Sequence, residues 1–253
     1  MAVGDGPGRR SLSCRSRSFM RREPKVVISP TALYGGAPWS EEWTVEGITQ
    51  LLEPMVGETR RERIRQALTA RLTSVTLLMD SPHDPHNGAA MLRSCDAFGV
   101  QEVHVIPREE RFFASNLVAK GTQRWVDVIE HPDPQGAITA LTARGFELIA
   151  THPQGELVPE ELGNLPRVCL VMGNEHDGIS QELTASAGRS VRIPMVGFVE
   201  SLNVSVSAAL LLREATKNRP GDLSPADFAR LYARGLFRSL KRAEDIVRAA
   251  QPR

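Results

Sequence analysis

The amino-acid sequence predicts an α/β fold, in which a mostly parallel sheet is covered by helices on both faces. Through the centre of the 253-residue chain, short apolar runs alternate with segments of helical periodicity, a pattern typical of such folds. Hydrophobic residues make up 41% of the chain and charged residues 24%, the balance of a globular protein with a sizeable core. No apolar run reaches the about 18–20 residues of a membrane-spanning helix, which excludes an integral membrane protein.

Short apolar runs in the centre of the chain predict the strands. They cover residues 75–79, 103–106, 147–151, 168–172 and 190–193. Segments of helical periodicity lie between them, at residues 88–98, 135–144 and 180–187. Because parallel strands end at one edge of a sheet, and ligands bind at that edge, polar residues that directly follow these strands are the first candidates for a functional site.

Helical extensions are predicted on both sides of this centre. Before it, a helix at residues 45–52 is stopped by Pro54, and a capping box at Thr59 and Glu62 predicts the start of a second helix. After it, a helix at residues 203–217 is apolar on most sides and is therefore expected to be buried. The final helix is expected to begin at Ser224, an N-cap followed by proline at the first helical position. It carries a basic stripe as well as an apolar one.

Charge is distributed unevenly along the chain. The net charge is +1, but residues 1–25 and residues 213–253 each carry +5, so the centre is acidic. Basic ends around an acidic centre indicate that the termini contact a polyanion, although basic tails that are merely solvated would give the same pattern. Residues 1–42 lack periodicity and are predicted to be a basic extension without a fixed fold.

Several kinds of site are disfavoured. The cysteines Cys14, Cys95 and Cys169 are odd in number and form no CxxC pair, which argues against a disulfide scaffold and indicates a reducing, cytoplasmic setting. His83 and His86 have no third ligand at a metal-like spacing, so no metal site is predicted. The sequence also lacks a G-x-S-x-G elbow, a P-loop and a dinucleotide-binding glycine fingerprint.

The first polar stretch, residues 85–99, follows the first predicted strand. Asn87 occupies the expected N-cap position of its helix. Arg93 lies off the apolar face of that helix and near its start, where anions bind favourably. Its planar guanidinium suits a phosphate ligand, although an ordinary surface arginine is the alternative.

Two further stretches follow later strands. In the second, Gly173 and Gly178 permit a tight turn that would carry Glu175 to the carboxyl edge of the sheet. In the third, Ser201 and Asn203 open the apolar helix, where they either cap it or face a ligand. Three polar loops at strand ends predict a pocket.

Together, these stretches resemble the motifs of the SpoU/TrmH family, RNA 2′-O-ribose methyltransferases of the SPOUT class. The first motif is matched by Asn87, Arg93, Ala97 and Gly99, and the second by Gly173, Glu175 and Gly178. The third, I-P-M-x-G-x-x-x-S-L-N-V-S-V, is matched from Ile193 to Val206 without a break. The helical flanks and the segment at residues 121–125 look most like the tRNA subgroup that methylates a D-loop guanosine.

The resemblance implies a deep trefoil knot near the carboxyl end and S-adenosylmethionine as methyl donor. It implies that the cofactor is bound by Thr151, Met172, Gly173, Ile193 and Leu202. It implies catalytic roles for Arg93, Asn87, Glu175, Ser201 and Asn203. Arg93 would either activate the ribose hydroxyl or bind the adjacent phosphate and the developing alkoxide; because arginine stays protonated, both roles remain open.

The implied reaction is 2′-O-methylation of a tRNA ribose, at guanosine 18 of the D-loop, by a homodimer formed through the knot region. The alternatives are the same chemistry on ribosomal RNA, or a non-catalytic RNA-binding relative. The expected organisation is a basic extension (1–42), a helical RNA-binding segment (43–72), the methyltransferase domain (73–218) and a second basic helical segment (219–253). The residues expected to contact tRNA phosphates are Arg60, Arg61, Arg65, Arg230, Arg234, Arg238 and Lys241.

Overall fold

The computed structural model describes residues 1, 37–108 and 125–250. Most of the extension expected over residues 1–42, and all but the last residue of the segment at 121–125, lie outside these described residues. In the part of the chain that is described, no helix is long and apolar enough to cross a membrane.

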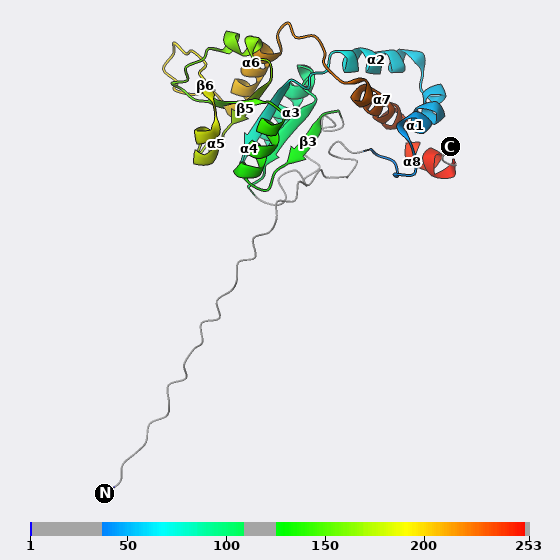
Figure 1. Ribbon diagram of the computed structural model, residues 1–253, viewed down its shortest axis with the longest axis horizontal. Coiled ribbons are helices and arrows are strands. Elements are labelled where there is room, and N and C mark those ends of the chain that lie inside the picture. The colour runs from blue at the N-terminus through cyan, green and yellow to red at the C-terminus, as the bar shows by residue number, and fades with distance from the viewer. Residues whose placement is uncertain (2–36, 109–124, 251–253) are drawn as a thin grey trace.

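The centre of the fold is a six-stranded sheet with the order β3-β2-β1-β5-β4-β6, and every strand pair in it is parallel (Figure 1). The strands are β1 (Val75–Asp80), β2 (Glu102–Ile106), β3 (Asp127–Glu130), β4 (Glu147–Thr151), β5 (Val168–Met172) and β6 (Arg189–Val191). The predicted parallel sheet is therefore confirmed. Strand β3 is not among the predicted strands, because it has four residues and begins and ends with an acid.

Helices cover both faces of the sheet, as predicted. They are α3 (Pro85–Ala97), α4 (Pro134–Ala143), α5 (Gln181–Ser186), the 3₁₀ helix η3 (Pro159–Asn164) and α6 (Val204–Thr216). Successive residues of a strand point to opposite faces. Leu77 of β1 thus joins the core under α3 and α6, whereas Leu78 joins the core under α4 and α5.

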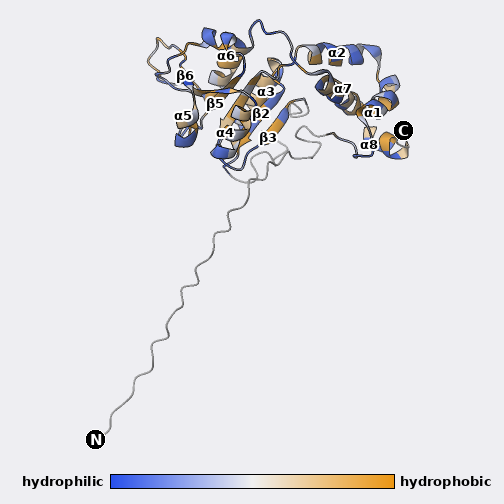
Figure 2. Cartoon of the chain, in the orientation of Figure 1, coloured by the Kyte–Doolittle hydropathy of each residue, from blue (hydrophilic) through white to orange (hydrophobic). Residues whose placement is uncertain are grey.

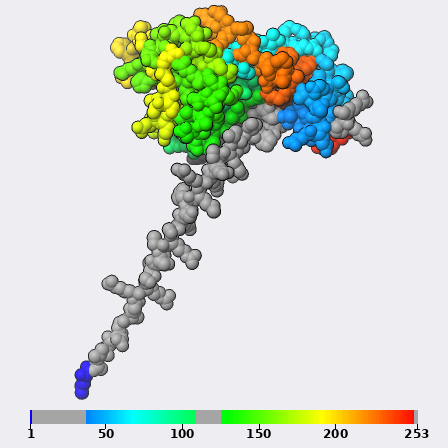
Figure 3. Space-filling model, in the orientation of Figure 1, coloured from blue at the N-terminus to red at the C-terminus, as the bar shows by residue number. Residues whose placement is uncertain are grey.

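The two ends of the described chain form a separate helical module beside the sheet (Figures 1 and 3). Its helices are α1 (Val45–Leu52), the 3₁₀ helix η1 (Glu53–Met55), α2 (Glu58–Thr69), α7 (Pro225–Ser239) and α8 (Ala243–Ala249). Their apolar faces share one core that includes Ile48, Ile64 and Leu236. The surface of α2 is largely hydrophilic (Figure 2), since its charged residues face outward.

Two helix starts differ from their predictions. Helix α2 begins at Glu58 with Gly57 as N-cap, so Thr59 forms no capping box. Helix α3 begins earlier than expected, because Pro85 occupies its first turn and Asp84 is the N-cap, accepting a hydrogen bond from His86 N at 2.8 Å. Asn87 therefore lies inside the helix, and its side chain is available for other contacts.

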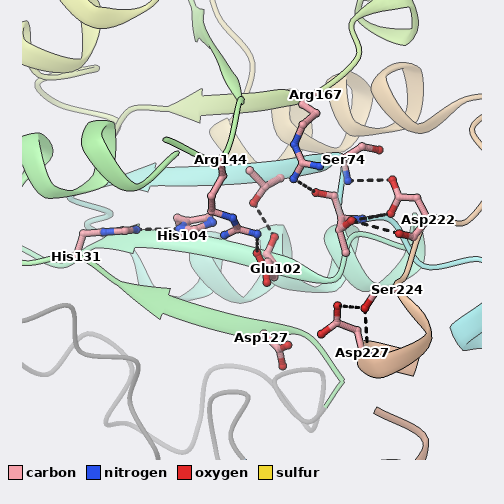
Figure 4. A network of polar contacts seen from close by, with 12 residues as sticks. Ser74, Glu102, His104, Asp127, His131, Arg144, Arg167, Asp222, Ser224 and Asp227 are labelled. Atoms are coloured by element: carbon pink, nitrogen blue, oxygen red, sulfur yellow. Dashed lines mark hydrogen bonds and ion pairs between the residues drawn. The ribbon is translucent and has the colours of Figure 1, made fainter. Parts of the chain in front are cut away.

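The predicted cap of α7 is confirmed: Ser224 Oγ accepts a hydrogen bond from Asp227 N at 3.1 Å (Figure 4). Helix α6 likewise begins where predicted, with Asn203 as its N-cap. In both sequences a residue type preferred at N-caps directly precedes the helical segment, and its side-chain oxygen accepts a hydrogen bond from a backbone N–H of the first turn.

Two chain crossings, residues 69–73 and 218–222, join the module to the sheet. We call these crossings, together with the contact between Arg234 of α7 and Asp127 of β3, the junction. Asp222 accepts a hydrogen bond from Ser74 N at 3.0 Å and one from Thr73 Oγ1 at 2.9 Å (Figure 4). Burial acts to raise the pKa of Asp222, but the hydrogen bonds from Thr73 and Ser74 outweigh it and lower that pKa. A Cβ on Gly221 would lie 1.8 Å from Thr69 O, so no side chain fits at this crossing.

Candidate active site

A cavity of about 480 Å³ lies at the carboxyl ends of β4, β5 and β6. Its walls come from the residues after β4, the turn after β5, the loop after β6 and the first turns of α6. Strands β5 and β6 follow one another in the chain but are separated in the sheet by β4, so the chain crosses over β4 at this edge. The cavity therefore occupies the position where open parallel sheets bind their ligands.

The turn after β5 holds one wall in place. Asn174 Oδ1 accepts hydrogen bonds from His176 N at 2.9 Å and Asp177 N at 2.7 Å. Gly178 has a φ of +69°, and a Cβ on Gly173 would lie 2.3 Å from the carbonyl carbon of Gly178. Both glycines are thus required by the backbone, and the turn presents Glu175 at its tip.

A buried carboxylate fixes the end of this turn. Asp80, the last residue of β1, is 3% exposed, and its Oδ2 accepts a hydrogen bond from Ser180 N at 2.7 Å. Sequence reasoning did not single out Asp80, although an acid that ends an otherwise apolar strand is a recognisable signal. The contact ties the start of α5 to the centre of the sheet.

The three sequence motifs meet in one hydrogen-bonded chain. Asn87 Nδ2 donates to the Glu175 carboxylate, and Asn87 Oδ1 accepts from Asn203 Nδ2 at 3.1 Å. Asn203 Oδ1 in turn accepts from Ser205 N at 2.8 Å, so the same side chain caps α6 and reaches Asn87. Residues separated by 88 and 116 positions in sequence are joined here.

Arg93 is placed apart from this chain of contacts. It lies six residues after Asn87 on α3, which rotates it by about 240° around the helix axis. Its side chain is exposed and does not line the cavity, and it makes no hydrogen bond or ion pair with any other described residue. Within one chain, the structure brings Asn87, Glu175 and Asn203 together but leaves Arg93 outside.

The residues expected to bind the cofactor all line the cavity, as does Ser201. They are Thr151, Met172, Gly173, Ile193 and Leu202. Thr151 Oγ1 donates to Val171 O at 3.1 Å, which ties the end of β4 to β5 at the cavity wall.

Sequence reasoning missed several other lining residues, among them His152, Asn174, Glu200 and Ser207. Ser207 carried a signal, because it lies one turn after Asn203 in the mostly apolar first part of the helix. The lining includes the carboxylates of Glu175 and Glu200 but no lysine or arginine of the described chain. That balance favours a ligand with positive charge over one with phosphate groups.

A second cavity, of about 210 Å³, lies between the helical module and the sheet. Arg60, Arg63, Arg71 and Arg234 line it together with Trp125, and Arg60 Cζ lies 5.5 Å from the centre of a Trp125 ring. Arg71 is 6% exposed, binds Asp96, and donates to Val100 O at 3.1 Å.

The residues expected to contact tRNA phosphates fall into different environments. Arg61 and Arg65 already pair with acids of α2 and η1, for example Arg65 with Glu53 at 2.7 Å. Lys241 is exposed, and Arg238 is half-buried. Arg230 lies 3.2 Å from Asp127.

The prediction for Arg234 is wrong. Its side chain is 2% exposed and pairs with Asp127, the first residue of β3. Burial lowers the pKa of Arg234, and the carboxylate of Asp127 partly offsets this effect. A guanidinium that is enclosed and paired in this way supports the junction and offers no surface to a phosphate.

Comparison with known proteins identifies the family. Residues 74–213, more than half of the chain, match the model of the SpoU rRNA Methylase family. The chain belongs to this family. Its matched region spans β1 to α6 and therefore contains the whole cavity.

Named relatives of this SpoU methylase include a tRNA (guanosine(18)-2'-O)-methyltransferase of Escherichia coli K12, 39% identical over 162 residues, which are 64% of this chain and 71% of the relative. The crystal structure of an A. aeolicus TrmH/SpoU tRNA modifying enzyme matches with a TM-score of 0.64 and 28% identity, over 72% of this chain and 98% of that one. An AdoMet-bound rRNA methyltransferase of Sinorhizobium meliloti matches with a TM-score of 0.52 and 25% identity, over 60% and 59% of the chains. Within its described residues, the chain has no cluster of side chains that could hold a metal ion.

Proposed function

We propose that the protein transfers a methyl group from S-adenosylmethionine to the 2′-hydroxyl of a ribose in tRNA, at guanosine 18. One observation carries the proposal: Asn87, Glu175 and Asn203 form a continuous hydrogen-bonded chain beside the cavity. The name of the 39% identical relative supports the choice of tRNA and of guanosine 18.

The cavity fits the cofactor in charge and in the apolar character of part of its lining. S-adenosylmethionine carries a sulfonium and an ammonium, and the lining offers Glu175 and Glu200 with no basic partner of the described chain to compete. Apolar side chains such as Ile179, Val191 and Leu202 would enclose the adenine. The AdoMet-bound structure of the Sinorhizobium meliloti relative supports the same assignment.

When bound, the cofactor would supply a methyl group that replaces the proton of the ribose hydroxyl, with the proton released to solvent and the cofactor leaving as its thioether. The residues of this chain orient the groups that react. Asn87 is hydrogen-bonded to both Glu175 and Asn203, and these bonds fix the position of the Glu175 carboxylate relative to the start of α6. Placement of this kind can supply much of the acceleration in a two-substrate reaction.

We further propose that the protein acts as a homodimer and that Arg93 acts in the site of the partner subunit. Arg93 is exposed and lies outside the cavity of its own chain. Large apolar side chains are exposed on the loop after β6 and on α6, namely Met195, Val196, Phe198, Val199, Val206 and Leu210. Several large apolar side chains exposed on two neighbouring segments of the chain favour a protein–protein contact there.

The knot, the domain boundaries and the location are part of the same proposal. A trefoil knot after β5, a methyltransferase domain over residues 73–218, helical RNA-binding segments at 43–72 and 219–253, and a cytoplasmic location all accord with the family. Exposed cations of the helical module, such as Arg60 and Lys241, would contact tRNA phosphates.

The test is transfer of tritium from labelled methyl donor to unmodified tRNA, followed by mass spectrometry of the digested product. Wild type is expected to label guanosine 18, and Arg93→Ala to lose at least about 100-fold in rate. Arg213→Ala, which changes an exposed arginine of α6 outside the cavity, is the matched control. Labelling of ribosomal RNA alone would overturn the tRNA assignment, and equal rates for Arg93→Ala would remove Arg93 from the reaction.

A further inference from the structure

His152 is a cavity residue that the proposed reaction does not use. It follows β4 directly, and it lines the cavity together with Pro153. Its backbone N donates to Val191 O at 3.0 Å, which continues the pairing of β4 with β6. Its backbone O accepts from Gly155 N at 3.0 Å, which closes a turn around the residue.

One ring nitrogen of His152, Nδ1, takes part in a hydrogen bond, and the other, Nε2, does not. Gln154 N donates a hydrogen bond to His152 Nδ1 at 3.1 Å. A nitrogen that accepts a hydrogen bond carries no proton, so the neutral ring must carry its proton on Nε2. The backbone therefore selects the tautomer in which Nε2 is a donor, and no other described residue receives that donor.

The turn that carries the ring is held rigidly. A Cβ on Gly155 would lie 2.4 Å from the carbonyl carbon of Val191, so the turn packs directly against β6. Arg192 Nη1 also donates to Gly155 O at 2.7 Å. A donor on a fixed support costs little ordering entropy when a ligand binds.

We infer that His152 Nε2–H donates a hydrogen bond to an oxygen of the bound S-adenosylmethionine, either its carboxylate or a ribose hydroxyl. The inference rests on the proposed function, because it requires that cofactor. The lining contains no lysine or arginine of the described chain that could serve the same oxygen. His152 is thus a binding residue that none of the three sequence motifs contains.

The test is calorimetric binding of S-adenosylmethionine to the full chain and to His152→Asn. Asparagine keeps the turn, because Asn174 of this protein makes the equivalent bond to the N–H two residues later at 2.9 Å. The same substitution removes the Nε2–H donor of His152. Affinity is expected to fall about 3- to 10-fold, the usual effect of one net hydrogen bond. His176→Ala changes an exposed histidine outside the cavity lining and should bind as wild type does.

A second ligand identifies the acceptor. Methylthioadenosine keeps the ribose but lacks the amino acid, so an equal loss for both ligands assigns the ribose and a loss for S-adenosylmethionine alone assigns the carboxylate. Unchanged affinity in His152→Asn would overturn the inference, as would a loss seen only in His152→Ala, which removes the turn as well as the donor. Failure of the wild type to bind S-adenosylmethionine would instead overturn the proposed function.

Discussion

The cavity at the sheet edge and the junction beside the helical module use polar side chains in opposite ways. At the cavity, the uncharged amides of Asn87 and Asn203 link the three motifs, and both side chains remain partly or largely exposed. No arginine of the described chain lines the cavity wall. At the junction, Arg71 and Arg234 are buried and paired with Asp96 and Asp127.

This difference shows that an arginine in a sequence can be interpreted only when it is known whether an acid of the same chain pairs with it. Arg93 and Arg234 both lie off the apolar stripe of a helix, so periodicity treats them alike. Arg234 is buried and paired with an acid of β3, whereas Arg93 makes no hydrogen bond or ion pair with another described residue. An arginine with an internal acid supports the fold, and one without is available to a ligand.

The largest expected effect is a loss of stability when the buried ion pair at the junction is broken. Arg234→Ala leaves the Asp127 carboxylate without its closest partner, and loss of one member of a buried ion pair typically costs about 3–5 kcal/mol of unfolding free energy. Urea denaturation measures this loss. Replacing both members, in Arg234→Met with Asp127→Leu, should recover most of it. A loss below about 1 kcal/mol in the single variant would show that Arg234 is not a structural element.

The second effect belongs to the cavity and should appear in activity rather than stability. Asn87→Asp sets a carboxylate against Glu175 and removes the amide that donates to it. Methyl transfer is expected to fall about 100-fold, since misplacement of a positioned group has that scale. The free energy of unfolding should change by less than about 1 kcal/mol, because the site is partly exposed. Full activity in Asn87→Asp would contradict the role of the hydrogen-bonded chain.

Sequence reasoning recovered different amounts of the two regions. It placed β4 and β5 and the caps of α6 and α7, because those signals are local. It gave Asn87 a capping role, because sequence alone does not reveal that Asp84 caps the helix and that Glu175 and Asn203 approach from elsewhere. Partners about 100 residues apart, such as Arg234 and Asp127, leave no local pattern to detect.

A third, smaller effect is the pH dependence of stability that two buried histidines produce. His104 and His131 lie in the sheet core with Nδ1 and Nε2 2.8 Å apart (Figure 4). Burial, with smaller contributions from His131 and Arg144, lowers the pKa of His104 to about 3; burial also lowers the pKa of His131, although Asp133 partly opposes it. His104 is thus neutral in the folded protein at pH values where an unfolded histidine, with a pKa of about 6.5, binds a proton, and the lowered pKa of His131 acts in the same direction.

Stability should therefore be complete above about pH 6.5 and decline as the pH falls below it, by up to about 1.4 kcal/mol per pH unit for each ring. At pH 5 the shift of His104 alone predicts a loss of about 2 kcal/mol, to which His131 adds, measured by denaturation at a series of pH values. The variant with His104→Leu and His131→Leu should lose that acid dependence, whereas His86→Ala, at an exposed position, should keep it. An unchanged acid limb in the double variant would assign the dependence to other groups.

The smallest expected effect returns to the exposed cations of the helical module. Lys241 is exposed and makes no ion pair with another described residue, so Lys241→Ala should change the unfolding free energy by less than about 0.5 kcal/mol. If Lys241 contacts a phosphate, the slope of log affinity for tRNA against log salt should fall by about 1. Arg242→Ala is the matched comparison, because Arg242 is similarly exposed but is already bound to Asp245 at 3.0 Å. A slope that changes for Arg242 and not for Lys241 would contradict the rule that an arginine or lysine without an internal acid is the one available to RNA.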